Sequence, residues 1–459
     1  MKNDATPLVA PKQQLSLTDA IAIIVGIVIG AGIFRTPSLV AANTESDTMF
    51  LFAWILGGLV SVIGALCYAE LTTAFPNAGG DYHFIRKAYG SRPAFLFAWA
   101  RMSIIQTGSI ALLAFIFGDY FSQIYNLGEF SSVIYAALVV IVLTAINIAG
   151  IGLGTAAQKL FTLAEVGGVV MIIIAGLFFI SAPAESHQPI TSSATSSGSF
   201  LGLAMVFVLL TFGGWNEAAY ISAELKSGKK RMVKALTISL VLITVIYILI
   251  NIAYLKALGH SGMTQSEAVG ADLMEIAWGS TGVWLIGIFV AISALTSANA
   301  TIFTGARTNY ALGKDYKIFS ALGKWNNQTA GPINSFLIQA AISLVLISLG
   351  LFTRSGFETI IEYTAPVFWF FFLLVGISLF VLRKKEPDTY RPFRVPLYPI
   401  TPLIFCLSSA YLLYSSIMYT GVGALVGIGV LLIGIMIHFI FNNIESRRKA
   451  NSVIDTKAS

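Results

Sequence analysis

Two short segments of the chain place paired glycines in the middle of apolar sequence. Residues 25–38 have the sequence VGIVIGAGIFRTPS, with Gly30 and Gly32, and residues 209–216 have the sequence LLTFGGWN, with Gly213 and Gly214. Glycine costs about 1 kcal/mol relative to alanine inside a helix. Each pair therefore indicates either close helix packing or a point where a helix unwinds.

An unwound helix has a definite binding chemistry. Its break exposes main-chain N–H groups, which together with the helix dipole favour a carboxylate, and main-chain carbonyls, which favour an ammonium group. An amino acid carries both groups on one carbon. Two breaks in one chain therefore predict a site for an amino acid, and glycine lets the ligand approach the main chain closely.

The packing alternative applies to the first segment. Gly26 and Gly30 form a small-xxx-small pattern, which commonly lies at helix–helix contacts in membranes. We interpret Gly26 and Gly30 as a packing face and residues 30–32 as the unwound turn. The second glycine pair, in the other half of the chain, favours a binding site.

Glu217 follows Asn216 directly after the second glycine pair. Its carboxylate could meet a cationic substrate side chain. It could equally stabilise the N-terminal end of the half-helix that follows, where acidic residues are favourable. The sequence leaves both roles open.

The composition is that of a membrane protein. Of 459 residues, 56% are hydrophobic and 11% are charged, whereas soluble domains have about 25% charged residues. Runs of about 20 apolar residues, each long enough to cross a bilayer as a helix, predict twelve membrane spans. They lie at 17–42, 49–75, 92–120, 131–150, 156–181, 199–224, 232–256, 280–308, 332–351, 357–382, 398–419 and 421–441.

The predicted fold is an all-α integral membrane protein, because the runs are too long and too uniformly apolar for barrel strands. Interrupted spans in matching positions, here the first and the sixth, are typical of inverted-repeat transporters. We expect two five-helix repeats, at 17–181 and 199–382, followed by helices 11 and 12 at 398–441. Residues 1–16 and 442–459 form tails.

Most of the 28 Lys and Arg residues lie in the segments on the side of the two tails. By the positive-inside rule both termini are cytoplasmic. The first apolar run is too long for a signal-peptide core, so we expect it to remain as a membrane helix. The prediction is a multi-pass protein of the plasma (inner) membrane.

Several function classes are disfavoured. The net charge of +6 belongs to the short connecting segments, which indicates topology rather than nucleic-acid binding. Cys67 and Cys406 lie far apart in apolar runs, and the four histidines show no ligand spacing. Without a nucleophile set, a metal cluster or a phosphate loop, we expect no enzyme, no cofactor and no metal.

Several short motifs occur in a specific order along most of the chain. They are GAGIF at 30–34, YAEL at 68–71 with Pro76, AGGDY at 78–82, FGGWN at 212–216 with ELK at 224–226, FTGAR at 303–307 and RPFRVP at 391–396. In these motifs the chain resembles the amino acid–polyamine–organocation (APC) superfamily, and within it the light-chain branch of L-amino-acid transporters.

The resemblance implies a leucine-transporter-like fold that works by alternating access. It implies that main-chain amides at residues 30–32 hold a substrate carboxylate and that carbonyls near Val28, Leu210 and Gly213 hold its amine. Phe212 and Asn216 would contribute to side-chain selectivity. The predicted substrate-binding residues are Val28, Ile29, Gly30, Ala31, Gly32, Leu210, Thr211, Phe212, Gly213, Gly214 and Asn216.

The chain departs from the family pattern at several positions. Ala31 stands where relatives often have serine, so a hydroxyl donor to the carboxylate is missing, and Leu210 replaces a common gating aromatic residue. Glu165 stands where many relatives have lysine in the fifth span. Arg101 in the third span stands where light-chain relatives tend to have an acid.

Charges inside a membrane are costly and normally paired, so we predict an ion pair between Arg101 and Glu165. If the pair persists throughout transport, its role is structural. If it breaks, Glu165 could be protonated in one state and couple transport to protons. The sequence does not decide between these roles.

The leading hypothesis is a secondary transporter of L-amino acids that works by exchange or with protons. The alternative is a polyamine or cationic amino acid permease, favoured by Glu217 and by the missing hydroxyl at Ala31. We expect the lipid bilayer and the amino acid as partners. Because the predicted external segment 125–131 contains no cysteine, we expect no disulfide-linked heavy chain, and a monomer or non-covalent dimer.

Overall fold

The computed structural model describes residues 16–77, 79–149, 154–180, 198–221, 229–266, 268–326, 329, 331–348, 356–420 and 424–440. These residues are almost entirely helical, and the only β-type pairing among them is an isolated bridge between Asn326 and Gly331. The predicted tails lie outside the described residues, apart from residue 16. The all-helical fold class is confirmed.

Among the described residues, the first half of the chain forms eight helices and three short 3-10 or π-helical segments. In chain order the elements are α1 Leu17–Val28, η1 Ala31–Phe34, α2 Thr36–Ala42, α3 Asp47–Ala74, α4 Gly80–Tyr89, α5 Ser91–Ala100, η2 Arg101–Ile105, α6 Gln106–Ile124, α7 Ser131–Ala149, α8 Gly154–Ile174 and η4 Ala175–Phe179.

The second half begins with another interrupted helix. Its elements are α9 Gly198–Thr211, η5 Trp215–Glu217, α10 Ala218–Ile221, α11 Lys229–Gln265, α12 Val269–Asp315, η7 Lys317–Phe319, α13 Ile333–Ser348, α14 Gly356–Lys385 and α15 Ile400–Thr420. A further apolar helix covers Ala424–Ile440.

Eight helices within the described residues are long and apolar enough to cross a membrane, and three shorter apolar helices accompany them. Each of the twelve predicted spans contains helix. The chain is therefore a multi-pass membrane protein. The division into two five-helix repeats stays a prediction.

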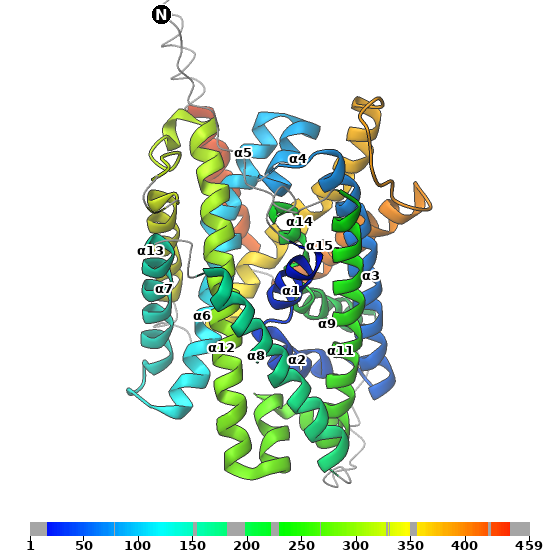
Figure 1. Ribbon diagram of the computed structural model, residues 1–459, viewed down its shortest axis with the longest axis vertical. Coiled ribbons are helices and arrows are strands. Elements are labelled where there is room, and N and C mark those ends of the chain that lie inside the picture. The colour runs from blue at the N-terminus through cyan, green and yellow to red at the C-terminus, as the bar shows by residue number, and fades with distance from the viewer. Residues whose placement is uncertain are drawn as a thin grey trace, which may run out of the picture.

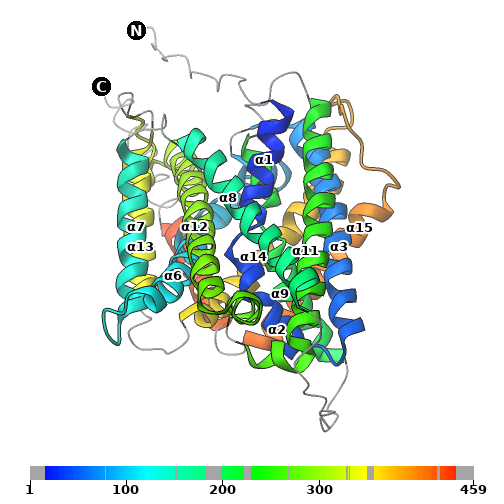
Figure 2. The same ribbon diagram turned by 60° about the horizontal axis from the view of Figure 1, so that its bottom comes forward.

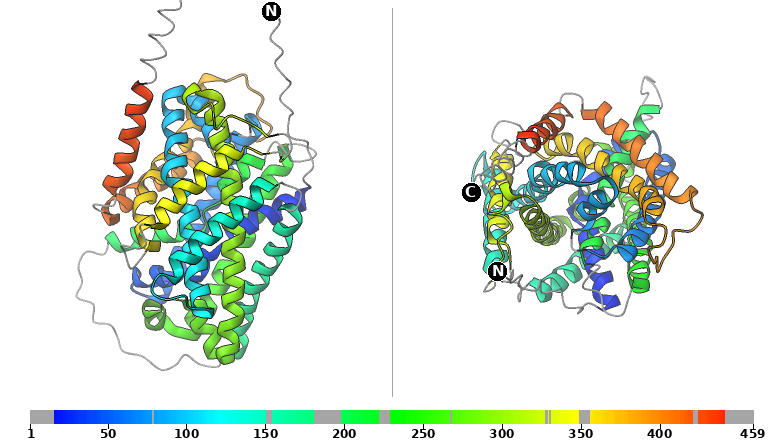
Figure 3. Two further views of the ribbon diagram at one scale, coloured as in Figure 1. Left: turned by 90° about the vertical axis from the view of Figure 1, so that its left-hand side faces the viewer. Right: turned by 90° about the horizontal axis from the view of Figure 1, so that it is seen from above.

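The interrupted helices lie at the centre of the bundle. In Figures 1 and 2, α7 and α13 lie on one side with α6 and α12 next to them, α3 and α11 lie on the opposite side, and α1, α2 and α9 lie between the two groups. The last helix, red in Figure 3, lies at the outer edge in both views. The most sheltered part of the bundle therefore surrounds the two predicted breaks.

Small residues bring the central helices together. A Cβ atom at Gly57 of α3 would lie 2.3 Å from Val208 Cγ1 of α9, and one at Gly26 of α1 would lie 2.2 Å from Thr162 Oγ1 of α8. Glycine at these positions permits a close approach that any side chain would prevent. The interpretation of Gly26 as a packing residue is confirmed.

Two features refine the sequence-based picture. α4 is a separate short helix between the second and third predicted spans. α11 and α12 continue beyond the membrane helices through kinks at Gly259 and Gly279, where φ is 65° and 63°. Residues 260–265 and 269–278 therefore form two short helical segments, one on each side of the turn that joins α11 to α12.

Candidate functional site

The first helix break lies between α1 and η1. α1 ends at Val28, and Gly30 adopts an extended conformation with φ −97° and ψ −178°. The Gly30 N–H turns back to the Val28 carbonyl at 2.7 Å. The main-chain N–H groups of Ala31 and Gly32 then occupy the opening positions of a new helical turn, where amides have no partner within the helix.

The second break lies between α9 and η5. The Gly213 N–H donates to the Leu210 carbonyl at 3.0 Å, and Gly214 is left-handed with φ 101°. A Cβ atom at Gly213 would lie only 2.7 Å from the Leu210 oxygen. The glycine pair is therefore required by the path of the chain.

The two breaks contact each other. A Cβ atom at Gly214 would lie 2.7 Å from Ile27 Cγ2 and 3.1 Å from the Ile27 carbonyl oxygen. On the other side of the breaks, the hydroxyl groups of Thr36 and Thr211 are 2.5 Å apart. The sequence predicted two breaks in matching positions, and the structure joins them into one site.

Tyr247 of α11 joins the ends of the two broken helices. Its hydroxyl lies 2.7 Å from the Val28 carbonyl oxygen and 3.2 Å from that of Thr211. The ring is fully buried and packs against Trp54 and Phe212, with ring centroids 5.7 Å and 4.9 Å away. Sequence analysis missed Tyr247 because it lies in an uninterrupted apolar helix with no local signal.

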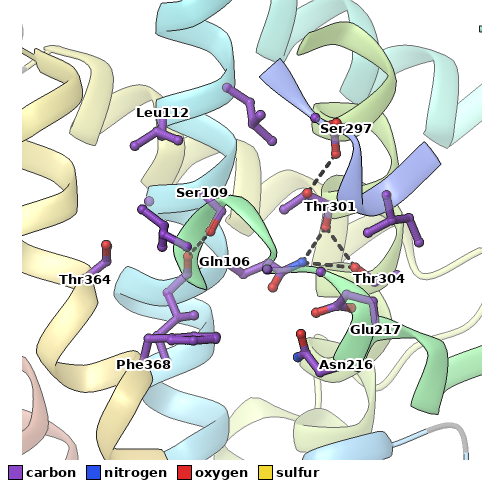
Figure 4. A pocket seen from close by; sticks show the side chains of 18 of the residues that line it. Gln106, Ser109, Leu112, Asn216, Glu217, Ser297, Thr301, Thr304, Thr364 and Phe368 are labelled. Carbon is purple, nitrogen blue, oxygen red and sulfur yellow. Dashed lines mark hydrogen bonds between the residues drawn. The ribbon is translucent and has the colours of Figure 1, made fainter. Parts of the chain in front are cut away.

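A cavity of about 210 Å³ opens beside the breaks, between α6, α12 and α14. Figure 4 shows polar side chains on one part of its wall and Phe368 on another. The lining includes eight of the predicted substrate-binding residues: Val28, Gly30, Gly32, Leu210, Thr211, Gly213, Gly214 and Asn216. The volume suits a molecule of amino acid size.

Two predicted residues lie away from this lining. Ile29 and Phe212 are fully buried in the core, and Phe212 packs between Trp54 and Tyr247. Phe212 supports the second break from behind, because its ring packs against Trp54 of α3 and Tyr247 of α11. The side chain of Ala31 lies outside the part of the structure that is described, so only its main chain enters the site.

α12 presents a row of hydroxyl groups to the cavity. Ser297, Thr301 and Thr304 all line it, and Figure 4 shows them along one helix. Gln106 of α6 is fixed against them, since its Nε2 donates to the Thr301 carbonyl at 2.8 Å and to Thr304 Oγ1 at 3.0 Å. Ser297, Thr301 and Thr304 are four and three positions apart within 280–308, a spacing that places them on one face of a helix. Sequence analysis did not use this signal.

Ser297 is the hydroxyl that faces the first break. Its Oγ is buried and has no hydrogen-bond partner among the described residues. A Cβ atom at Gly30 would lie 3.1 Å from that oxygen. A buried polar group without a partner costs stability, so this hydroxyl is positioned for a ligand.

The predicted ion pair between Arg101 and Glu165 is wrong. Arg101 lies in the π-helical segment η2, and its Nη2 lies 2.7 Å from Glu217 Oε1 and 3.0 Å from Oε2. Both side chains are largely buried, with 4% and 14% of their surface exposed. The guanidinium is directed at the end of the second break, where Glu217 follows the turn at Gly214, so Arg101 pairs with a nearer acid than Glu165.

Glu165 occupies a different environment. It is fully buried in α8 and accepts a hydrogen bond from the Ser293 hydroxyl of α12. Its Oε2 has no hydrogen-bond partner among the described residues. Glu165 is therefore an acid without a neighbouring cation in the described part of the chain.

Asp81 is the third acid near the cavity. It lies in the first turn of α4, outside the membrane-spanning helices, and 4% of it is exposed. Burial raises the pKa of its carboxyl to about 7, although the Arg101 guanidinium opposes the shift. Nothing in the sequence connects Asp81 with Arg101, because α4 brings Asp81 next to Arg101 only in the folded chain.

Comparison with known proteins decides the family. A model of the family described as "Amino acid permease" matches residues 15–441. The chain belongs to this family. The permease is 30% identical to b(0,+)-type amino acid transporter 1 of Mus musculus over 412 residues. The aligned region covers 89% of this chain and 83% of that protein.

A second relative, large neutral amino acids transporter small subunit 2 of Mus musculus, is 30% identical over 443 residues, or 94% of this chain and 81% of that protein. The resemblance to the APC superfamily and its light-chain branch is confirmed. The relatives are amino acid transporters, so the permease is a member of a transporter family and not of an enzyme family.

Proposed function

We propose that this permease is a secondary active transporter of neutral L-amino acids that works by alternating access. The observation that carries the proposal is the contact between two helix breaks beside one cavity of about 210 Å³. Amides at the start of a helical turn lie on one break, and main-chain carbonyls lie on the other. This arrangement matches the two charges of an amino acid.

The substrate carboxylate binds the main-chain amides at Ala31 and Gly32 and the hydroxyl of Ser297. The ammonium group binds carbonyls at the second break, near Leu210 and Gly213. The Val28 carbonyl already accepts from the Gly30 N–H and from the Tyr247 hydroxyl, so both of its lone pairs are in use. Because Ser297 supplies a hydroxyl from α12, the alanine at position 31 does not leave the carboxylate with main-chain donors alone.

The substrate side chain points to the wall formed by Gln106, Thr301 and Phe368. Glu217, which could have received a cationic side chain, is paired with Arg101. This pairing favours neutral substrates, in keeping with a relative whose name specifies large neutral amino acids. The alternative, a polyamine or cationic amino acid permease, is favoured by Asp81, which adds a second acid beside one arginine.

Coupling is by exchange or by proton symport. Glu165 is a candidate for the proton-carrying group because it is buried with a single hydroxyl donor, Ser293. The competing role is structural, a tie between α8 and α12. Replacing Glu165 with Gln distinguishes the two roles. If Glu165 couples transport to protons, the variant folds and exchanges substrate but cannot accumulate it with a pH gradient. If Glu165 is structural, the amount of folded protein falls.

We place the permease in the plasma membrane with both termini in the cytoplasm, on the charge distribution of its connecting segments. We also propose that it has no disulfide-linked heavy chain. Its only two cysteines, Cys67 and Cys406, are both buried within helices. It then functions as a monomer or a non-covalent dimer.

Counterflow in proteoliposomes tests the proposal. Vesicles are loaded in turn with unlabelled L-alanine, L-leucine, L-phenylalanine, L-lysine or putrescine, and uptake of the labelled compound is measured with and without a pH gradient. We expect exchange of neutral amino acids and none of putrescine, which has no carboxylate. If folded protein exchanges none of the amino acids, the proposal is wrong. Exchange of putrescine would favour the alternative function, a polyamine or cationic amino acid permease.

A further inference from the structure

Two carboxyl groups and one guanidinium meet at one end of the cavity. Asp81, Arg101 and Glu217 all belong to its lining, and they come from α4, η2 and η5. Arg101 binds Glu217 through both carboxylate oxygens. With every group ionised, this buried cluster carries one net negative charge, and a buried uncompensated charge is strongly unfavourable.

The excess charge lies on Asp81. Its Oδ1 is buried and has no hydrogen-bond partner among the described residues. Arg101 and Glu217 act on it electrostatically with opposite signs, and Tyr68 of α3 and Asn216 of η5 act on it as hydrogen-bond donors. The Arg101 guanidinium is already committed to Glu217, so it compensates Asp81 only in part.

Four cationic side chains on and around α4 have partners of their own. Arg86 binds Asp315 at the end of α12, Lys87 binds Glu386 just after α14, and Lys385 donates to the Ala88 carbonyl at 2.8 Å. Arg383 of α14 binds Glu70 of α3 at 2.6 Å. These contacts direct the remaining charges away from Asp81.

We propose that Asp81 is a proton-binding site of the transport cycle, which takes up a proton when this end of the cavity closes and releases it when that end opens. A proton adds an O–H bond to the carboxyl group and brings the cluster to zero net charge. On opening, water hydrates Asp81, the O–H bond breaks and the proton passes to solvent. The inference rests on the proposed transport function.

In the structure Asp81 is buried, so we assign it to the arrangement in which this end of the cavity is closed. α4 is fastened by Tyr82, whose hydroxyl lies 2.5 Å from Asp315 Oδ2, and by Tyr89, whose hydroxyl lies 2.8 Å from the Leu374 carbonyl of α14. These contacts hold the first turn of α4 over Arg101. Burial in this state favours the neutral acid, as the raised pKa of Asp81 indicates.

This assignment differs from a coupling role for Glu165. Glu165 is outside the cavity lining and is fully buried against Ser293. Asp81 lies on an element outside the membrane-spanning helices, next to the second break, and so reaches water when that end of the cavity opens. The two acids can therefore be separated by single substitutions.

The main experiment uses the full-length permease in proteoliposomes that contain the pH indicator pyranine. The probe is whichever labelled amino acid exchanges in the counterflow panel. We expect its addition to move protons in the wild type. Asp81→Asn, which mimics the protonated form, should abolish proton movement while exchange persists and becomes independent of pH between about 5 and 8. Asp119→Asn, an exposed acid on α6, is the matched control and should behave as wild type.

Proton movement by Asp81→Asn equal to that of the wild type overturns the inference, as does wild-type exchange without proton movement at any pH. If Asp81→Asn does not fold, Glu217→Gln is the second variant for this test. It frees Arg101 for Asp81, so the pH midpoint of transport should shift to lower pH. An unchanged or higher midpoint contradicts the proposal.

A second measurement is independent of transport. An acid whose pKa is raised by folding binds more protons in the folded state, so stability is highest at low pH and falls as pH rises from about 4 to 7. The melting temperature of the wild type in detergent should fall over this window, and that of Asp81→Asn should fall less. This result would support the proton site even if no amino acid exchanged. Equal slopes would overturn it.

Discussion

The two helix breaks achieve similar openings by different means. Gly30 has an ordinary φ of −97°, and the nearest atom to a Cβ placed there is the end of a flexible serine side chain. Gly214 is left-handed and lies against the main chain of Ile27. The first break therefore has space on its ligand side, and the second is fixed by its own backbone and by its neighbour.

Charge separates the two breaks further. The second break is followed at once by Glu217, which binds Arg101, and Asp81 lies nearby. The first break has hydroxyl groups around it, from Ser297 and Thr36. We infer that the first break binds the substrate carboxylate and that the second break, besides offering carbonyls to the ammonium group, sets the conformation of the site.

The largest effect is expected from Arg101→Met. Removing one partner of a buried ion pair leaves an uncompensated charge and costs about 3–5 kcal/mol. Here Glu217 loses the partner at 2.7 Å, and Asp81 loses its only nearby cation among the described residues. Thermal unfolding in detergent should show a large drop in melting temperature.

The matched control is the double change Arg101→Met with Glu217→Gln, which removes both charges of the pair. It should recover part of the lost stability, since no unpaired Glu217 remains. If the double variant is less stable than Arg101→Met, the ion pair is not what stabilises the second break.

Gly214→Ala should have the next largest effect. A non-glycine residue in a left-handed conformation costs about 1–2 kcal/mol, and the added Cβ would lie 2.7 Å from Ile27 Cγ2. We expect lower stability and loss of exchange. Gly167→Ala on α8 is the control, because a Cβ there meets no atom within 4 Å. Near-normal exchange by Gly214→Ala would show that the second break tolerates displacement.

Tyr247→Phe tests the link between the breaks. The change keeps the ring and removes the hydroxyl that lies near the Val28 and Thr211 carbonyls, at a cost of about 1 kcal/mol. We expect a small drop in melting temperature and a larger drop in exchange rate. The control is Tyr254→Phe, whose buried hydroxyl has no partner among the described residues. Equal effects of the two changes would leave Tyr247 with a packing role alone.

Local sequence signals predicted the breaks well. Paired glycines in apolar runs conflict with helix propensity, and that conflict is visible without tertiary information, so the sequence located a break at Gly30 and one at Gly213–Gly214. Ala31 and Gly32, which were expected to be unwound as well, already belong to the 3-10 helix η1. The apolar runs likewise predicted the helices, because span length follows from bilayer thickness.

Long-range pairing was not predictable in the same way. Arg101 was expected to pair with Glu165 because both are charged and intramembrane, but sequence contains no information on which side of its helix each faces. A π-helical segment at 101–105 further changes the direction of Arg101. The role of Tyr247 and the contacts of Asp81 with Arg101 and Glu217 were missed for the same reason, since these partners lie on other elements.

The smallest effect is expected at the ligand side of the first break. Ser297→Ala removes a hydroxyl that faces Gly30 and has no protein partner among the described residues, so stability should not fall. If this hydroxyl donates to the substrate carboxylate, its loss costs about 1 kcal/mol of binding, or a roughly fivefold higher KM at unchanged melting temperature.

A compensating change sharpens this prediction. Ala31→Ser adds, at the first break, a hydroxyl in place of the one that Ser297→Ala removes. In the double variant the KM should return toward that of the wild type, because the carboxylate again has one hydroxyl donor besides the main chain. An unchanged KM in Ser297→Ala would mean that the amides of the first break hold the carboxylate without help from α12, and the first break would then resemble the second in relying on backbone alone.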